Sequence, residues 1–314
     1  MTPAEPMSVA EPMTAAAVAV APSRPLRARL ADALELTKPR VTSMVLLTTL
    51  AGFYMGSRGA LDLALLAHVL VGTALAAAGA SALNQYVERD ADARMLRTRA
   101  RPLPAGRMEP AHALLFGCLL SMAGLAQLAM AVNRVAAGLV ALTLLSYVFI
   151  YTPLKTRSAL CTMVGALPGA LPPLVGWAAA DGGITPGGMA LFAILFIWQM
   201  PHALAIACLY RDDYARGGFV LLPVVTGGNE VTGRIAMANA VLLVPLSLLP
   251  ALWGYAGGAY FWGALALGVA LALTAVPLMF DPTSRAARRL LLVSVAYLPA
   301  LLGLMALDRQ IPVR

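Results

Sequence analysis

Long stretches without a charged residue alternate with short charged segments along most of the chain. A bilayer core about 30 Å thick is crossed by roughly 20 residues of helix. None of the stretches shows the apolar and polar alternation of an outer-membrane barrel strand. They therefore predict transmembrane helices, and they occupy residues 41–57, 63–87, 113–133, 135–154, 158–180, 182–210, 235–280 and 290–307.

The stretch at 235–280 is too long for a single crossing. Its centre at 253–262 is rich in glycine and flanked by tryptophan, which is typical of a turn at the membrane surface. We therefore expect an all-α, polytopic membrane protein with nine spans. A single transmembrane domain is expected at 41–307, a disordered tail at 1–23, an amphipathic segment on the membrane surface at 24–40 and a short tail at 308–314.

The composition agrees with a membrane protein. Of the 314 residues, 60% are hydrophobic and 12% are charged, whereas soluble domains carry about 45–50% and about 25%. With nine spans, 19 of the 23 Lys and Arg residues fall on the side of the N terminus. The positive-inside rule places that side in the cytoplasm. Topology thus explains the net charge of +8, and no basic soluble domain is left to bind nucleic acid.

Two of the predicted cytoplasmic loops, 88–112 and 211–234, are longer than a simple connection requires, and loops of this length are usually functional. The first directly follows a span. If that helix continues, Asn84, Glu88 and Asp92 lie on one stripe because they are spaced four residues apart. Magnesium is held by oxygen ligands, often one or two carboxylates together with substrate phosphates. The stripe therefore predicts a magnesium site.

Arginines follow the stripe closely, and guanidinium groups are permanently charged, bidentate donors for phosphate. In the second loop, Asp212 and Asp213 could complete a second metal position. Two alternatives stay open from the residues alone: a solvated helix end with ion pairs between successive turns, and an ordinary polar turn. The predicted diphosphate ligands in these loops are Arg94, Arg97, Arg101 and Arg216.

Tyr151 and Lys155 lie at the cytoplasmic end of the fourth span, again four residues apart. They present a hydroxyl and an ammonium group on one helix face, which suits a diphosphate leaving group. The alternative is a lysine that reaches past the membrane surface beside an interfacial tyrosine.

These residues resemble the UbiA-type intramembrane prenyltransferases, and within them the protohaem IX farnesyltransferase (haem O synthase) branch. The resemblance covers roughly residues 36–305. It is carried by N-Q-Y-V-E-R-D-A-D-A-R-M-L-R-T-R-A-R-P-L at 84–103, Y-T-P-L-K at 151–155, W-Q-M-P-H-A-L-A-I-A at 198–207 and D-Y-A-R-G-G-F-V-L-L-P-V at 213–224.

The resemblance implies a nine-helix bundle in the inner (plasma) membrane, with its active site open to the cytoplasm. Asn84, Glu88 and Asp92 match the first Asp-rich motif, and Tyr151 and Lys155 match the Tyr-x-x-x-Lys pair. The implied catalytic set is these five residues with Asp213, and the implied metal ligands are Asn84, Glu88, Asp92 and Asp213. The second Asp-rich motif of the quinone-type relatives has two aspartates, and here only Asp213 is a counterpart; this departure also resembles the haem branch, in which the second motif is degenerate.

The resemblance further implies the substrates and the cofactor. Magnesium is the expected cofactor, farnesyl diphosphate the donor, and haem B (protohaem IX) the acceptor and not a permanent cofactor. Farnesyl would be added to a vinyl group, with addition of water, to give haem O for a downstream haem A synthase. His202 lies within P-H-A-L-A and is a candidate to orient haem, although a lone membrane histidine is more often a packing residue.

Two other functions remain as alternatives. A UbiA-type enzyme with an aromatic quinone-precursor acceptor would use the same metal and diphosphate chemistry. A secondary transporter would place ionisable residues near the middle of the membrane on broken helices. Here the acids and bases lie almost entirely at the cytoplasmic ends, although the 165–173 segment carries three prolines.

Overall fold

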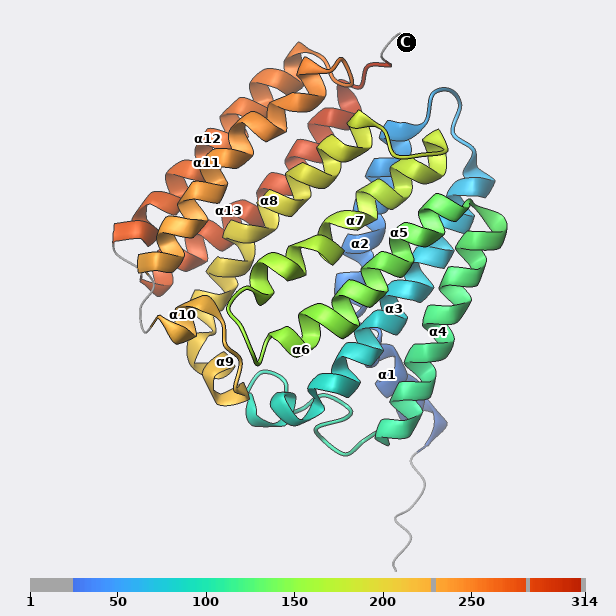
Figure 1. Ribbon diagram of the computed structural model, residues 1–314, viewed down its shortest axis with the longest axis vertical. Helices are drawn as coiled ribbons and strands as arrows, with labels where there is room; N and C mark the ends of the chain where they lie inside the picture. The colour runs from blue at the N-terminus through green and yellow to red at the C-terminus, as the bar shows by residue number, and fades with distance from the viewer. Residues whose placement is uncertain (1–24, 227–229, 281–282, 312–314) are drawn as a thin grey trace, which may run out of the picture.

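The computed structural model describes residues 25–226, 230–280 and 283–311, which form one bundle of helices (Figure 1). The predicted tail at 1–23 lies outside the described residues. The helices, with η1 a π-helical segment, are α1 Leu26–Leu36, α2 Pro39–Gly56, α3 Leu63–Arg94, α4 Pro110–Ala131, α5 Arg134–Leu145, η1 Ser146–Tyr151, α6 Thr152–Leu154, α7 Cys161–Asp181, α8 Pro186–Leu209, α9 Arg211–Gly217, α10 Leu222–Val225, α11 Glu230–Leu252, α12 Gly258–Phe280 and α13 Ser284–Leu307.

The all-α membrane class is confirmed. Within the described residues, eight helical segments are long and apolar enough to cross a membrane: α3, α4, the continuous α5 to α6, α7, α8, α11, α12 and α13. The remaining expected span corresponds to α2, which has 18 residues and carries Thr42, Ser43, Thr48 and Thr49. α2 is not among the eight helices of the described residues that are long and apolar enough to cross a membrane, so the count of nine stays a prediction.

The two long connections contain regular structure. α3 continues to Arg94, so the helix runs through the whole predicted stripe and the first part of loop 88–112 is helical. The second connection, 211–234, contains α9 and α10, and α11 already begins at Glu230. Residues 227–229 lie outside the described part of the chain. The charged segments are therefore shaped by helices that the apolar pattern did not predict.

Glycines allow α2 and α7 to pack backbone against backbone. A Cβ atom on Gly52 would overlap the carbonyl oxygen of Pro173, and one on Gly176 would overlap that of Thr49. In a membrane, such small residues let helices approach closely where no hydrophobic effect drives them together. This close packing fixes α2 beside α7 and so fixes the position at which α2 begins.

The bundle has two distinct ends (Figure 1). α1, α6, α9, α10 and the connection from α3 to α4 gather at one end, which we call the basic end. The turn between α11 and α12, the connection from α7 to α8 and the last described residues lie at the opposite end. The basic end contains the polar stripe of α3.

Candidate active site

The polar stripe expected on the second span is present on α3. Asn84, Glu88 and Asp92 are 1%, 7% and 0% exposed, respectively. Their spacing of four residues on a continuous helix places them on one side of it. A buried charge costs several kcal/mol unless it is paired. The partners of these side chains therefore define the site.

Each carboxylate of the stripe meets a cation. Lys155 Nζ lies 2.7 Å from Glu88 Oε1, and Arg101 Nη1 donates to Asp92 Oδ2 over 2.6 Å. The four side chains come from α3, the turn after it and the end of α6. Segments distant in the sequence thus converge on one charged centre.

Asn84 also contacts a cation, Lys38, and the sequence pattern did not predict that Lys38 belongs to the site. Lys38 Nζ donates to Asn84 Oδ1 over 2.7 Å, and Asn84 Nδ2 donates to Thr152 Oγ1 over 3.1 Å. Lys38 lies between α1 and α2 with a left-handed φ of 47°. The available signal was a lysine directly before Pro39 at the start of an apolar stretch. We call Lys38, Arg101 and Lys155 the cation cluster.

Burial changes the basicity of Lys38. Removal from water, and then the neighbouring Arg101 guanidinium, lower the pKa of Lys38 from 10.5 to about 7, against the opposing effect of Glu88. Desolvation disfavours the charged form of an amine, and a neighbouring like charge does the same. A negatively charged ligand would therefore be favoured next to this ammonium group.

Lys155 stays protonated. Burial alone would lower the pKa of Lys155, but neighbouring Tyr151 and the Glu88 carboxylate outweigh it and raise the pKa well above its ordinary value. The ammonium group also lies 4.5 Å from the centre of the Tyr151 ring, a favourable cation–π distance. Tyr151 is stacked on Tyr147, with ring centres 5.5 Å apart, because the π-helical η1 carries both.

Asp213 lies on α9 and binds the turn after α3 instead of the stripe. Its carboxylate accepts the backbone N–H groups of Leu96 at 2.8 Å and Arg97 at 3.3 Å, and it accepts Arg216 at 2.9 Å. Burial raises the pKa of Asp213, but these hydrogen bonds outweigh it and lower the pKa below its ordinary value. Asp213 thereby ties the two long connections together, while Asp212 is exposed.

The predicted diphosphate arginines lie in different places. Arg101 contacts the stripe directly. Arg94 donates to the carbonyl oxygen of Gly217 over 2.8 Å, and the Arg97 guanidinium lies against the rings of Tyr210 and Tyr214. Within the described residues, Arg101 is thus the only one of the four that binds a side chain of the stripe.

The donor set suits magnesium that also binds a phosphate. The described residues contain no group of three or more His, Cys, Asp and Glu side chains able to hold a metal by themselves. The stripe offers two carboxylates and one amide oxygen. Asp92 Oδ1 is buried and has no hydrogen-bond partner, so it is available to a ligand. Magnesium commonly binds one or two carboxylates and completes its shell with water and substrate phosphate.

A mostly apolar cavity of about 270 Å³ extends into the bundle from Tyr151. It follows α5 and η1 from Tyr151 to Val140, eleven residues or roughly 16 Å of helix. Its polar lining includes Gln199 and Thr73, whose buried hydroxyl has no hydrogen-bond partner. The cavity therefore offers an elongated hydrocarbon chain a mostly apolar channel, whose Tyr151 end lies beside Lys155 of the charged centre.

His202 lies on α8 but is not among the residues that line this cavity. Its Nδ1 is 2.9 Å from Ser294 Oγ on α13, and its ring is stacked on Trp198, with centres 4.8 Å apart. Because Nδ1 is engaged, Nε2 is the ring nitrogen left for a ligand. The haem-binding role of His202 stays a prediction.

The family is shown by comparison with known proteins. Residues 45–302 match the model of the UbiA prenyltransferase family. The chain therefore belongs to the UbiA prenyltransferase family, and this is the class of protein that its helical bundle and charged centre define.

The similar curated proteins point to one branch. The chain is 46% identical over 287 residues to the protoheme IX farnesyltransferase of Solibacter usitatus, covering 88% of this chain and 98% of that protein. It is 44% identical over 286 residues to the protoheme IX farnesyltransferase of an Anaeromyxobacter species, covering 91% and 96%.

Solved structures share the fold at low sequence identity. A structure described for digeranylgeranylglyceryl phosphate synthase superposes with a TM-score of 0.76 at 18% identity, covering 89% of this chain and 98% of that one. A UbiA homologue from Archaeoglobus fulgidus bound to DMAPP and Mg2+ superposes with a TM-score of 0.65 at 17% identity, covering 88% and 99%.

Proposed function

We propose that the protein transfers the farnesyl group of farnesyl diphosphate to a vinyl group of protohaem IX, with addition of water, and so forms haem O and diphosphate. The single observation that carries the proposal is the charged centre beside the Tyr151 end of the apolar cavity, where each residue of the stripe meets a cation. A prenyl diphosphate is built in a matching way, with a charged diphosphate at one end and an apolar chain attached to it. The naming of the similar curated proteins supports protohaem as the acceptor.

The stripe and the cation cluster divide the binding of the diphosphate. Asn84, Glu88 and Asp92 would hold magnesium, and Lys38, Arg101 and Lys155 would hold phosphate oxygens. When bound, magnesium supplies positive charge beside the diphosphate as the bond to the allylic carbon breaks. The three cations act on the same developing charge, and their burial strengthens the effect.

The apolar cavity would hold the farnesyl chain and keep water from the allylic cation. The stacked rings of Tyr147 and Tyr151 lie where the chain meets the charged centre, and an aromatic face stabilises a nearby cation. The allylic carbon then bonds to the vinyl carbon of haem. Water adds to the resulting haem-side cation and loses a proton, which gives the hydroxyethylfarnesyl group.

Asp213 differs from the sequence-based expectation of a metal ligand. We propose that it positions the turn that carries Arg101, because its oxygens already accept two backbone N–H groups and Arg216. A haem-orienting role of His202 would act through Nε2. A His202→Gln variant with an unchanged KM for protohaem would remove His202 from the haem site.

The orientation in the membrane is also part of the proposal. We propose nine spans, with α2 as the first and the basic end in the cytoplasm of an inner (plasma) membrane protein. Exposed Leu26, Leu30 and Leu34 lie four residues apart on α1 and would rest that helix on the membrane surface. The expected consumer of the product is a haem A synthase.

Purified protein in lipid vesicles, given labelled farnesyl diphosphate and magnesium, tests the proposal with two acceptors. Protohaem should take up the label, and an aromatic quinone precursor should not. Asp90→Asn is the matched control for Asp92→Asn, because Asp90 lies two residues earlier on α3 but is exposed. Label transfer to the quinone precursor alone would overturn the haem assignment.

A further inference from the structure

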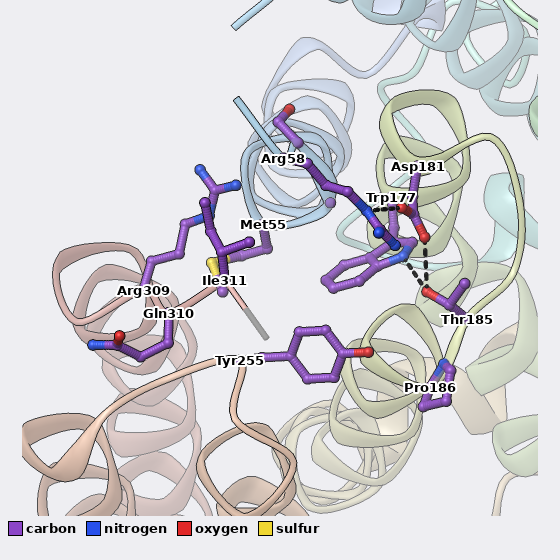
Figure 2. Close-up of a pocket in the computed structure, with 12 residues that line it drawn as sticks. Met55, Arg58, Trp177, Asp181, Thr185, Pro186, Tyr255, Arg309, Gln310 and Ile311 are labelled. Carbon is purple, nitrogen blue, oxygen red and sulfur yellow. Dashed lines mark hydrogen bonds and ion pairs between the residues drawn. The ribbon is translucent and has the colours of Figure 1, made fainter. Parts of the chain in front are cut away.

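A second cavity, of about 330 Å³ (Figure 2), is lined by elements that lie at the end of the bundle opposite the basic end (Figure 1). It is formed by the ends of α2 and α7, the start of α8, the turn between α11 and α12 and the segment after α13. The polar stripe lies far from this cavity along α3, because Asn84 is 21 residues, or roughly 30 Å of helix, from the start of α3. This cavity is therefore not part of the proposed active site.

The lining of the cavity carries a net positive charge. Arg58 Nε donates to Asp181 Oδ1 over 2.7 Å, which neutralises one guanidinium while 48% of the Arg58 side chain stays exposed. Arg309 has no carboxylate partner within the described residues, and its buried Nε has no hydrogen-bond partner. Its guanidinium lies 4.7 Å from the centre of the Tyr54 ring. The positive charge of Arg309 is therefore available to an anion.

Backbone contacts hold Arg309 in place. The N–H of Gln310 donates to the carbonyl oxygen of Tyr255 over 2.9 Å, and Gly257 N–H donates to that of Asp308 over 2.9 Å. Asp308 is not among the residues that line the cavity, and its carboxylate accepts the N–H of Tyr260 at the start of α12. The segment after α13 therefore forms a fixed wall and presents its arginine at a defined position.

The opposite wall of the cavity is aromatic, and hydrogen bonds join it to the start of α8. Trp177 and Tyr255 pack edge to face, with ring centres 5.3 Å apart (Figure 2). Trp177 Nε1 donates to Thr185 Oγ1, which donates to Asp181 Oδ2. Thr185 is the N-cap residue of α8, and with its hydroxyl so engaged it makes no capping hydrogen bond to that helix. The positive end of α8 therefore adds to the field in the cavity.

We infer that this cavity binds the phosphate group of an anionic membrane phospholipid, with Arg58 and Arg309 as its ligands. Guanidinium groups bind phosphate through paired, charge-assisted hydrogen bonds. The Trp177 and Tyr255 rings offer an apolar surface to the part of the lipid beside the headgroup. The position at one end of a transmembrane bundle is the depth at which lipid phosphates lie, and the surplus charge favours a net anionic lipid over a zwitterionic one.

Native mass spectrometry of the delipidated, full-length protein tests this inference with added phosphatidylglycerol or phosphatidylcholine. Wild type should retain phosphatidylglycerol preferentially, and Arg309→Gln should bind it about tenfold more weakly, as expected for loss of one charge-assisted contact. Arg309→Lys should retain part of the affinity. Arg134→Gln is the matched control, because Arg134 is an exposed arginine at the start of α5, outside the cavity lining.

Two outcomes would overturn the inference. If Arg309→Gln retained phosphatidylglycerol as well as wild type and the Arg134→Gln control, the cavity would not be the lipid site. If inorganic phosphate at the same concentration displaced phosphatidylglycerol, the ligand would be free phosphate and the lipid assignment would fail. Farnesyl transfer should persist in Arg309→Gln, which separates loss of the lipid from loss of the fold.

Discussion

Replacement of Asp92 by asparagine removes one negative charge from the charged centre and changes its shape very little. Asp92 is 0% exposed, one oxygen binds Arg101 at 2.6 Å, and the other has no hydrogen-bond partner. Asparagine still offers Arg101 an acceptor. With all three members of the cation cluster charged, the centre that includes Glu88 changes from a net charge of +1 to +2.

The expected magnitudes follow from this geometry. Breaking a buried ion pair typically costs about 3–5 kcal/mol. We expect a smaller loss of about 1–2 kcal/mol here, because the acceptor is kept and Arg101 is 23% exposed. Catalysis should suffer more. Removal of one group that stabilises developing charge lowers kcat by about 100- to 1000-fold.

The assay separates metal binding from phosphate binding. The magnesium concentration for half-maximal activity of Asp92→Asn should rise at least about tenfold, since a metal ligand is lost. The KM for farnesyl diphosphate should not rise, because the remaining positive charge attracts the diphosphate. Isothermal titration with magnesium and unreactive diphosphate gives the same comparison without turnover.

The Asp90→Asn variant serves as the control for the substitution itself. Asp90 is exposed and its closest charged contact is Arg89 at 3.9 Å, so wild-type kinetics are expected. If Asp92→Asn kept the wild-type kcat and magnesium requirement, the assignment of the stripe to magnesium would be refuted.

Three further changes test other parts of the account. Lys155→Met should lower farnesyl transfer by more than about 100-fold, and Lys155→Arg should restore part of it; equal activity of Lys155→Met and wild type would exclude a role in diphosphate departure. Asp213→Asn should raise the KM for farnesyl diphosphate without changing the magnesium requirement, whereas a shifted requirement would make Asp213 a metal ligand. Gly176→Ala should destabilise the protein in detergent by about 1–3 kcal/mol because its Cβ overlaps the α2 backbone; Gly138→Ala, which has open space, should not, and equal melting temperatures would contradict the close packing.

The sequence predicted the features that depend on local periodicity. Apolar stretches gave the membrane helices, and a spacing of four residues placed Asn84, Glu88 and Asp92 on one helix face, as the continuation of α3 to Arg94 confirms. The count of spans was harder to predict, because α2 packs against α7 in the bundle although it is not among the described helices that are long and apolar enough to cross a membrane.

Features that depend on tertiary contacts could not be predicted in the same way. Lys38 joins the site through a left-handed residue between two helices, 46 residues from Asn84. The partners of Asp213 are backbone N–H groups, which no side-chain pattern records. A carboxylate at the expected place in a motif can therefore position a loop, and its identity alone does not distinguish this from metal binding.

Formation of haem O at the charged centre can be measured in cells. The most direct test is extraction and mass analysis of haem from membranes of a host that lacks its own haem O synthase and expresses wild type, Asp92→Asn or Asp90→Asn. We expect hydroxyethylfarnesyl haem with wild type and Asp90→Asn, and its loss with Asp92→Asn. Unmodified protohaem in membranes that contain well-expressed, inserted wild type would contradict the assignment of haem O synthesis to this protein.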